Sequence, residues 1–108
     1  MTDFADRVRI RATTETQRLG LAGLEGMVYG WTTPSCTGVE VIGDRGEDFA
    51  VNVHFEALGR AFWFDEGLVE LLDHGAGTVA RLEGSDREWV RLPDGGWEER
   101  ARSDGDGR

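Results

Sequence analysis

Two histidines and several carboxylates are the residues of this 108-residue chain most suited to acid–base or metal chemistry. His54 and His74 are its only histidines, and Asp65, Glu66 and Asp73 lie between them in the sequence. A zinc site needs three or four ligands at short, recognisable spacings, and two histidines in separate segments do not supply them. We therefore predict no metal ion, no cofactor and no catalytic group, and hence a protein that is not an enzyme.

The remaining candidates for covalent or phosphate chemistry are equally weak. Cys36 is the only cysteine, so the chain cannot form an internal disulfide or a cysteine metal site. No basic residue lies within four positions of it to activate the thiol. The glycine-rich stretch "GLAGLEG" lacks the lysine and the following helix of a phosphate-binding loop. The sequence therefore predicts a role in binding.

The most suggestive binding feature is the aromatic stretch "FAVNVHFEALGRAFWF", residues 49–64. It predicts a β-hairpin, because apolar residues alternate on both sides of a short loop closed by Gly59. The first strand should turn four apolar side chains into the core, namely Phe49, Val51, Val53 and Phe55. On the return strand we expect Phe62 and Phe64 to point inward and Trp63 outward.

An outward Trp63 has two possible roles. It is either covered by the C-terminal hairpin, through Trp89 or Val90, or exposed as an anchor for a partner protein. Tryptophan is enriched among the few residues that dominate interface energetics. The predicted partner-binding residues are Trp63, Glu56, Asp65 and Glu66.

Charge favours a protein partner over a nucleic acid. The net charge is −9, and all 12 basic residues are arginine. Acidic surfaces repel phosphate backbones, whereas they speed encounter with basic proteins. The only concentrated basic feature is a run of three arginines, Arg7, Arg9 and Arg11, which leaves nucleic-acid binding as a less favoured alternative.

Short apolar runs between frequent glycines predict an all-β domain. The predicted strands are residues 7–12, 25–31, 39–43, 49–55, 60–64 and 68–73, the last begun by a 3₁₀ turn. Residues 78–84 and 88–100 form either one more hairpin or an extension beside these strands. Thr13 or Thr14 should cap a single helical turn, with Leu19, Leu21 and Leu24 packing beneath the sheet.

Two features of the chain's layout complete this prediction. We expect sharp bending or close backbone approach at Gly26 and Gly30. Residues 1–101 should form one domain, with the C-terminal hairpin at about 75–101, and residues 102–108 should be a disordered polar tail.

The runs "VRIRAT", "GLEGMVYG", "AVNVHF" with "AFWF", and "LVELLD" resemble in order and spacing the small SH3-like barrels of bacterial proteins. These include KOW-type translation domains, the variable chain of ferredoxin–thioredoxin reductase, photosystem I subunit IV and the nitrile hydratase β-subunit barrel. The resemblance covers residues 6–74 and implies a five-stranded SH3-like barrel, here with an additional C-terminal β-hairpin. It transfers no functional residue, and the basic glycine-centred loop of KOW nucleic-acid binders is missing.

These observations predict a non-enzymatic protein-interaction or accessory module of a bacterial cytoplasmic complex. The alternative suggested by the reductase and hydratase barrels is a small regulatory subunit packed beside a larger catalytic chain. No signal-like segment and no apolar run of about 20 residues is present in the sequence, so we expect a cytoplasmic protein without a membrane span.

Overall fold

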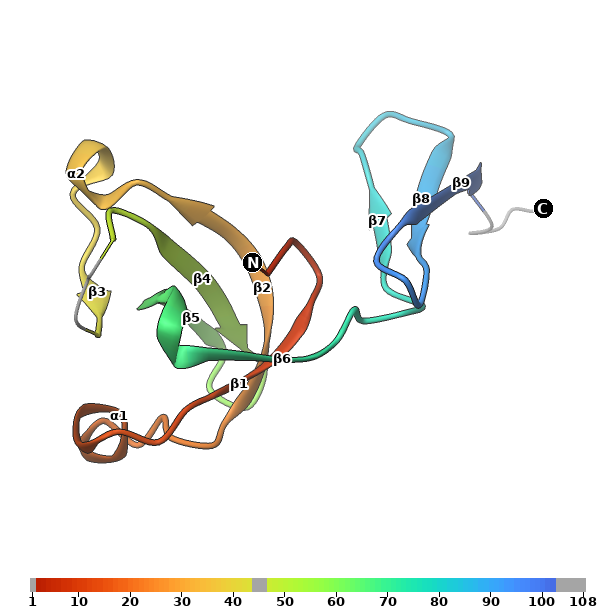
Figure 1. Ribbon diagram of the computed structural model, residues 1–108. Helices are drawn as coiled ribbons and strands as arrows, with labels where there is room; N and C mark the ends of the chain where they lie inside the picture. Colours follow the sequence, from red (N-terminus) through yellow and green to blue (C-terminus); the bar gives the residue numbers. More distant parts are fainter. Residues whose placement is uncertain (1, 44–46, 103–108) are drawn as a thin grey trace. The chain divides into compact units, whose positions relative to one another are not determined.

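A computed structural model describes residues 2–43 and 47–102 of the chain (Figure 1). The described residues form an all-β protein, with nine strands in two sheets and only short helices. The chain divides into two compact units, Met1–Asp73 and His74–Arg108. We refer to them as the N-terminal unit and the C-terminal unit and describe each by itself.

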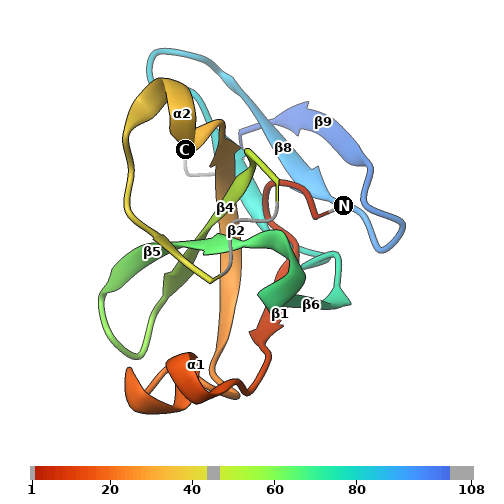
Figure 2. The same ribbon diagram turned by 60° about the vertical axis from the view of Figure 1, so that its left-hand side comes forward.

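The N-terminal unit is built on one six-stranded sheet. Its strands are β1 (Arg7–Ile10), β2 (Glu25–Thr32), β3 (Val41–Ile42), β4 (Ala50–Phe55), β5 (Arg60–Asp65) and β6 (Val69–Asp73). Their order is β3-β5-β4-β2-β1-β6, with all neighbours antiparallel except β3 and β5. Figures 1 and 2 show that the sheet curls around its inner face into a half-barrel. The resemblance implies a barrel of five strands, whereas this sheet has six; β3, which lies within the predicted strand 39–43, joins it by pairing in parallel with β5.

The inner face of the curled sheet carries the hydrophobic core. Its buried members are Val8, Ile10, Leu21, Val28, Val51, Val53, Phe55, Phe64 and Val69. The rings of Phe55 and Phe64 meet nearly edge to face, with centroids 5.9 Å apart and planes at 80°. Phe49 and Phe62 are partly buried and pack against this cluster. The predicted inward facing of both strands of the hairpin is therefore confirmed.

The long loop between β1 and β2 begins with a single helical turn, α1 (Thr14–Arg18). The Thr13 hydroxyl accepts a hydrogen bond from the Thr16 backbone N–H at 3.0 Å, and the Thr16 hydroxyl accepts one from the Thr13 N–H at 2.8 Å. This reciprocal capping satisfies two backbone donors. Gly20 follows with a φ of +77°, a conformation that glycine adopts without strain. The predicted cap and short helix are both present.

Two of the three leucines in this loop pack as predicted. Leu21 is only 3% exposed and belongs to the core, and Leu24 is partly buried against it. Leu19 is 46% exposed, so its predicted burial is wrong. It lies at the C-terminal cap of α1, where the chain leaves the helix and the side chain is directed to solvent.

Gly26 and Gly30 shape β2 in different ways. A Cβ atom added at Gly26 would lie 2.6 Å from the His54 carbonyl oxygen and 2.7 Å from Val53 Cγ1, so glycine lets β4 come close. At Gly30 a Cβ would meet nothing within 4 Å. The register between β2 and β4 instead shifts between Val28 and Gly30, as in a β-bulge. The close approach is at Gly26 and the irregularity beside Gly30.

The C-terminal unit is a three-stranded antiparallel sheet in the order β7-β8-β9. Its strands are β7 (Val79–Arg81), β8 (Arg87–Arg91) and β9 (Trp97–Ala101), so the predicted segment 88–100 is divided into two strands, β8 and β9. Arg102, the first residue of the predicted tail, donates its backbone N–H to the Asp86 carbonyl at 2.9 Å. The rest of that predicted tail, residues 103–108, lies outside the described residues.

An ion-pair network of one glutamate and two arginines crosses the C-terminal sheet. Glu88 of β8 is fully buried between Arg81 of β7 and Arg100 of β9, its register partners. It accepts hydrogen bonds from Nε of Arg81 at 2.8 Å and Nε of Arg100 at 2.5 Å. The hydrogen bond from Arg81, followed by that from Arg100, lowers the pKa of Glu88 below its ordinary 4.5. Every fully buried hydrophobic side chain in the described parts of the chain lies in the N-terminal unit. The described part of this unit therefore combines a sheet without fully buried hydrophobic side chains with an ion-pair network that joins its three strands.

Acid should loosen the C-terminal unit. The pKa of Glu88 is lower in the folded chain than in the unfolded chain. The stabilisation by the ionised Glu88 in this ion-pair network is therefore fully present above pH 4.5. It is lost as the pH falls from there through the folded pKa. We expect the urea midpoint of the β8 amide NMR signals to fall between pH 6 and pH 3, and to fall less in Glu88→Gln. The control is Glu99→Gln, which removes an exposed carboxylate; a Glu88→Gln midpoint as acid-sensitive as wild type would contradict the prediction.

Candidate functional site

Three aromatic side chains lie on the outer side of the N-terminal sheet, opposite the core: Tyr29, His54 and Trp63. Each is next in sequence to a fully buried core residue, so strand alternation directs it outward. His54 is opposite Ala61 in β5, which makes Trp63 its diagonal neighbour. Aromatic side chains can bridge that diagonal separation. We call these three residues the aromatic face.

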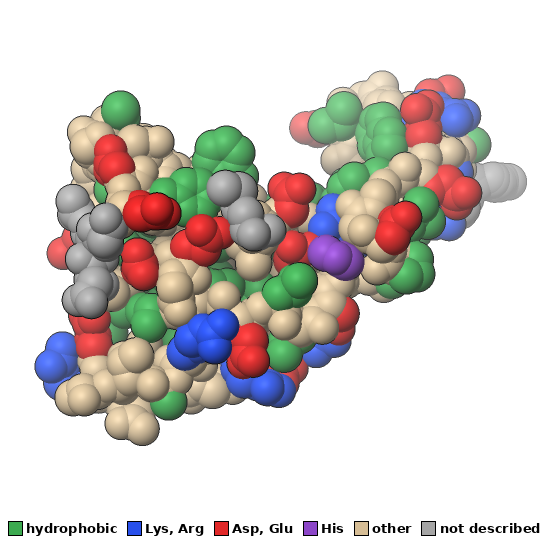
Figure 3. Space-filling view, viewed as in Figure 1, with side chains coloured by type: hydrophobic (Ala, Val, Ile, Leu, Met, Phe, Trp, Pro, Cys, Tyr) green, Lys and Arg blue, Asp and Glu red, His purple; other side chains and the backbone are tan. Residues whose placement is uncertain are grey.

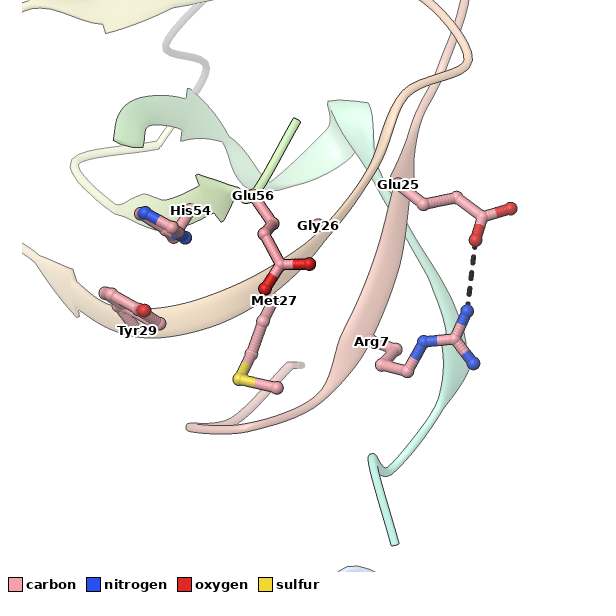
Figure 4. A pocket seen from close by; sticks show the side chains of 7 residues that line it. All are labelled: Arg7, Glu25, Gly26, Met27, Tyr29, His54 and Glu56. Atoms are coloured by element: carbon pink, nitrogen blue, oxygen red, sulfur yellow. Dashed lines mark hydrogen bonds and ion pairs between the residues drawn. The ribbon is translucent and has the colours of Figure 1, made fainter. Parts of the chain in front are cut away.

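An open depression of ≈ 340 Å³ lies beside the Tyr29 end of the aromatic face (Figure 4). The rings of Tyr29 and His54 form one side of it, stacked with centroids 4.8 Å apart and planes within 2° of parallel. Figure 4 shows the side chain of Glu56 reaching between this pair and Arg7, next to Met27. The depression therefore combines aromatic, thioether and carboxylate surfaces.

Ion pairs occupy the charged side of the depression. Arg7 contacts Glu25 at 3.0 Å and Asp73 at 2.7 Å, and Arg9 contacts Glu25 at 2.8 Å. The hydrogen bond from Arg9, together with the positive charges of Arg9 and Arg7, lowers the pKa of Glu25 below its ordinary 4.5, against an opposing effect of burial. Two members of the arginine run are thus already compensated by carboxylates. The third, Arg11, is exposed.

Trp63 points outward, as strand alternation predicts, and it is half-buried. Its backbone pairs with Asn52 in β4 and with Val41 in β3. The indole therefore lies over the middle of the outer surface, between the hairpin partner strand and the short edge strand. Of the four predicted partner-binding residues, it is the one at the centre of a structured surface.

The three predicted acidic residues do not gather in one place. Glu56 follows β4 in the hairpin turn, at the depression. Asp65 ends β5, where its carboxylate accepts a hydrogen bond from the Gly67 N–H at 3.1 Å and caps a 3₁₀ turn, Glu66–Leu68. Five steps of strand separate the two ends of the hairpin, roughly 17 Å at ~3.3 Å per residue. Glu56 and Asp65 thus flank the aromatic face at opposite ends, with Glu66 beyond the second.

Sequence reasoning did not select Met27 or Tyr29 as binding residues. Met27 and Tyr29 both reach the outer side by strand alternation around the buried Val28, and the register shift after Val28 brings the next aromatic, Trp31, to the other side. The signal in the sequence that could have indicated this irregularity is Gly30, which lies between the aromatic residues Tyr29 and Trp31. Beyond the bulge, Trp31 pairs with Val51 on the inner side of the sheet. Its ring tilts against Phe49 and remains 56% exposed, so it belongs to a different surface.

The residues with metal or thiol chemistry remain dispersed. Within residues 2–43 and 47–102, no three His, Cys, Asp or Glu side chains gather as metal ligands would. His54 stacks on Tyr29, and His74 begins the other unit. Cys36 is exposed in the short helix α2 (Pro34–Thr37). None of the described helices has the length and apolar character to span a bilayer.

Comparison of the chain with protein-family models, curated proteins and solved structures finds no match. The interpretation of the site therefore depends on its own geometry and charge.

Proposed function

We propose that this chain is a non-enzymatic protein-interaction module that binds a basic partner protein through its aromatic face. In this proposal it serves as an accessory component of a larger cytoplasmic complex in a bacterium. The single observation that carries the proposal is the aromatic face itself, with Tyr29 50% exposed and Trp63 half-buried on a structured sheet. Large amphipathic side chains held on a rigid surface are typical anchors of protein interfaces.

Strand order supports an SH3-like architecture for the N-terminal unit. A first strand, a long loop, a second strand, a hairpin and a closing strand follow one another as the resemblance requires. The closing strand β6 lies beside β1, and a 3₁₀ turn precedes it. The curled sheet carries the aromatic face on the outer side of β2, β4 and β5.

The charge of the N-terminal unit supports a basic partner. Residues 1–73 contain thirteen carboxylates and six arginines, a net charge of −7. On the face drawn in Figure 3, acidic side chains are spread over this unit, and the basic side chains visible there lie toward α1 and β1. Such a field steers a positively charged protein during encounter and is screened by salt. The compensation of Arg7 and Arg9 by carboxylates weakens the nucleic-acid alternative.

Trp63→Ala tests this proposal. We expect the variant to keep its free energy of unfolding within about 1 kcal/mol of wild type, as is usual for surface changes. It should lose 2 kcal/mol or more of partner affinity, roughly thirtyfold. The measurement is quantitative affinity capture from extract of the source cells, followed by titration of the captured protein and by urea unfolding.

Trp31→Ala is the matched control, because Trp31 is also a half-exposed tryptophan of the same unit but lies on the inner side of the sheet. It should retain the partner. Equal loss of the partner in both variants would count against the aromatic face as the binding surface. A stability loss of 3 kcal/mol or more in Trp63→Ala would show that the indole is part of the fold.

A further inference from the structure

We propose that the depression beside Tyr29 and His54 receives a lysine or arginine side chain of the partner. This inference rests on the proposed function and specifies the chemistry that the partner must present. The recognised group is an alkyl stem that ends in a cation. Three properties of the depression carry the inference, namely its size, its lining and its uncompensated charge.

The size fits one long side chain. At ≈ 340 Å³ the depression lies near the lower limit of about 300–1,000 Å³ that is usual for small-molecule sites. It is an open depression, and its lining side chains come from β1, β2, β4 and the turn that follows β4. A side chain that projects from a partner surface can enter such a depression without any movement of the strands around it.

The lining suits both parts of a basic side chain. Met27 and the stacked rings of Tyr29 and His54 provide apolar surface for a methylene stem. The half-exposed ring of Tyr29 also offers its negative face to a cation. Long basic side chains bury their stems on apolar surface and keep the charged end near water or a carboxylate.

The charge balance favours a cation over an anion. Arg7 is the only arginine or lysine among the described lining residues, and its guanidinium already contacts Glu25 and Asp73. The backbone carbonyl of Glu56 accepts a hydrogen bond from the Gly59 N–H at 3.2 Å, but its carboxylate makes no hydrogen bond or ion pair with any residue that the structure describes. Its carboxylate can therefore take a new cationic partner without breaking an existing contact.

Titration of the isotopically labelled full chain with small probes tests the inference by amide NMR shifts. The cationic probes are Nα-acetyl-lysine methylamide and Nα-acetyl-arginine methylamide. The neutral and anionic controls are the norleucine and glutamate analogues. We expect the cationic probes to shift the signals of residues 27, 29, 54 and 56 with Kd on the order of 1 mM. The neutral and anionic probes should bind at least about fivefold more weakly.

Two charge-matched variants separate local recognition from the general acidic field. Glu56→Gln keeps the side-chain shape and should weaken cationic probe binding about fivefold or more. Glu40→Gln removes the same charge from an exposed position outside the depression and should change binding less than twofold. Equal weakening in both variants, equal binding of norleucine, or shifts confined to other residues would each overturn the inference.

These outcomes are distinguishable from failure of the proposed function. If Trp63→Ala abolishes partner capture while Glu56→Gln has no effect on either partner or probe, the aromatic face binds a partner but the depression does not receive its cation. If the probes bind at the depression and Trp63→Ala captures the partner normally, the proposed cation site is supported. The proposal that the partner binds through the aromatic face is then wrong.

Discussion

Replacement of Phe55 by alanine is expected to lower the free energy of unfolding of the N-terminal unit by about 3–5 kcal/mol, the usual range for truncating a buried phenylalanine. Phe55 is 1% exposed, and its ring packs against Phe64 at 5.9 Å and Phe62 at 6.2 Å between centroids. Alanine would leave a cavity among these rings and the valines of β4. The total stability of a domain of this size is about 5–15 kcal/mol, so a large fraction would be lost.

Urea unfolding followed by tryptophan fluorescence and by NMR signals of β4 measures this effect. Leu58→Ala is the control, because Leu58 lies in the turn that follows β4 and is 46% exposed. It should change the free energy of unfolding by less than about 0.5 kcal/mol. A loss below about 1 kcal/mol for Phe55→Ala would show that the ring is not part of the cooperative core.

The core strands were predictable because their side chains alternate without interruption. In β1, Val8 and Ile10 are buried while Arg7 and Arg9 are exposed, a period of two that the sequence displays directly. The same alternation fixes the facing of Phe55 and the other residues of the β4–β5 hairpin. Local capping by Thr13 was also predictable, since it depends on residues only three positions apart.

The features that could not be predicted from the sequence depend on strand register and on pairing between strands that are distant in the sequence. A bulge shifts side chains from one side of a strand to the other, so the opposite facing of Tyr29 and Trp31 required knowledge of where β2 pairs with β4. The pairing of β3 with β5 depends on a parallel contact between distant segments. The buried Glu88 looks in sequence like any strand carboxylate, and only its neighbours in β7 and β9 explain its burial.

In the candidate site, too, the local properties could be predicted from the sequence and the contacts between strands could not. Trp63 and Glu56 were identifiable as an outward aromatic and a turn carboxylate, because both properties are local. That Glu56 lies beside Tyr29 depends on how β2 pairs with β4, whereas its separation from Asp65 follows from the hairpin itself. The sequence shows a run of three arginines but does not show that Arg7 and Arg9 pair with Glu25. These ion pairs compensate the charge of two of the three arginines.

Replacement of Gly26 by alanine is expected to cost about 3 kcal/mol of stability, at the upper end of the usual penalty for overpacking. The added methyl would lie 2.6 Å from the carbonyl oxygen of His54, 2.7 Å from Cγ1 of Val53 and 3.0 Å from Cδ1 of Phe55. The nearest of these atoms is backbone, so a change of side-chain rotamer cannot relieve the contact. Strand β4 would have to move away from β2, which disturbs the core on one side and the aromatic face on the other.

Gly30→Ala provides the matched control within the same strand, because a methyl group there would meet nothing within 4 Å and φ is not positive. Its free energy of unfolding should stay within about 0.5 kcal/mol of wild type, or rise because alanine restricts the unfolded chain more than glycine. Urea unfolding of the two variants side by side measures the difference. Gly26→Ala should also shift the amide signals of residues 53–55, since β4 must be displaced. Equal stabilities for the two variants would mean that β2 and β4 are not in close contact at Gly26, and the depression beside Tyr29 and His54 would then lack the strand pairing that forms it.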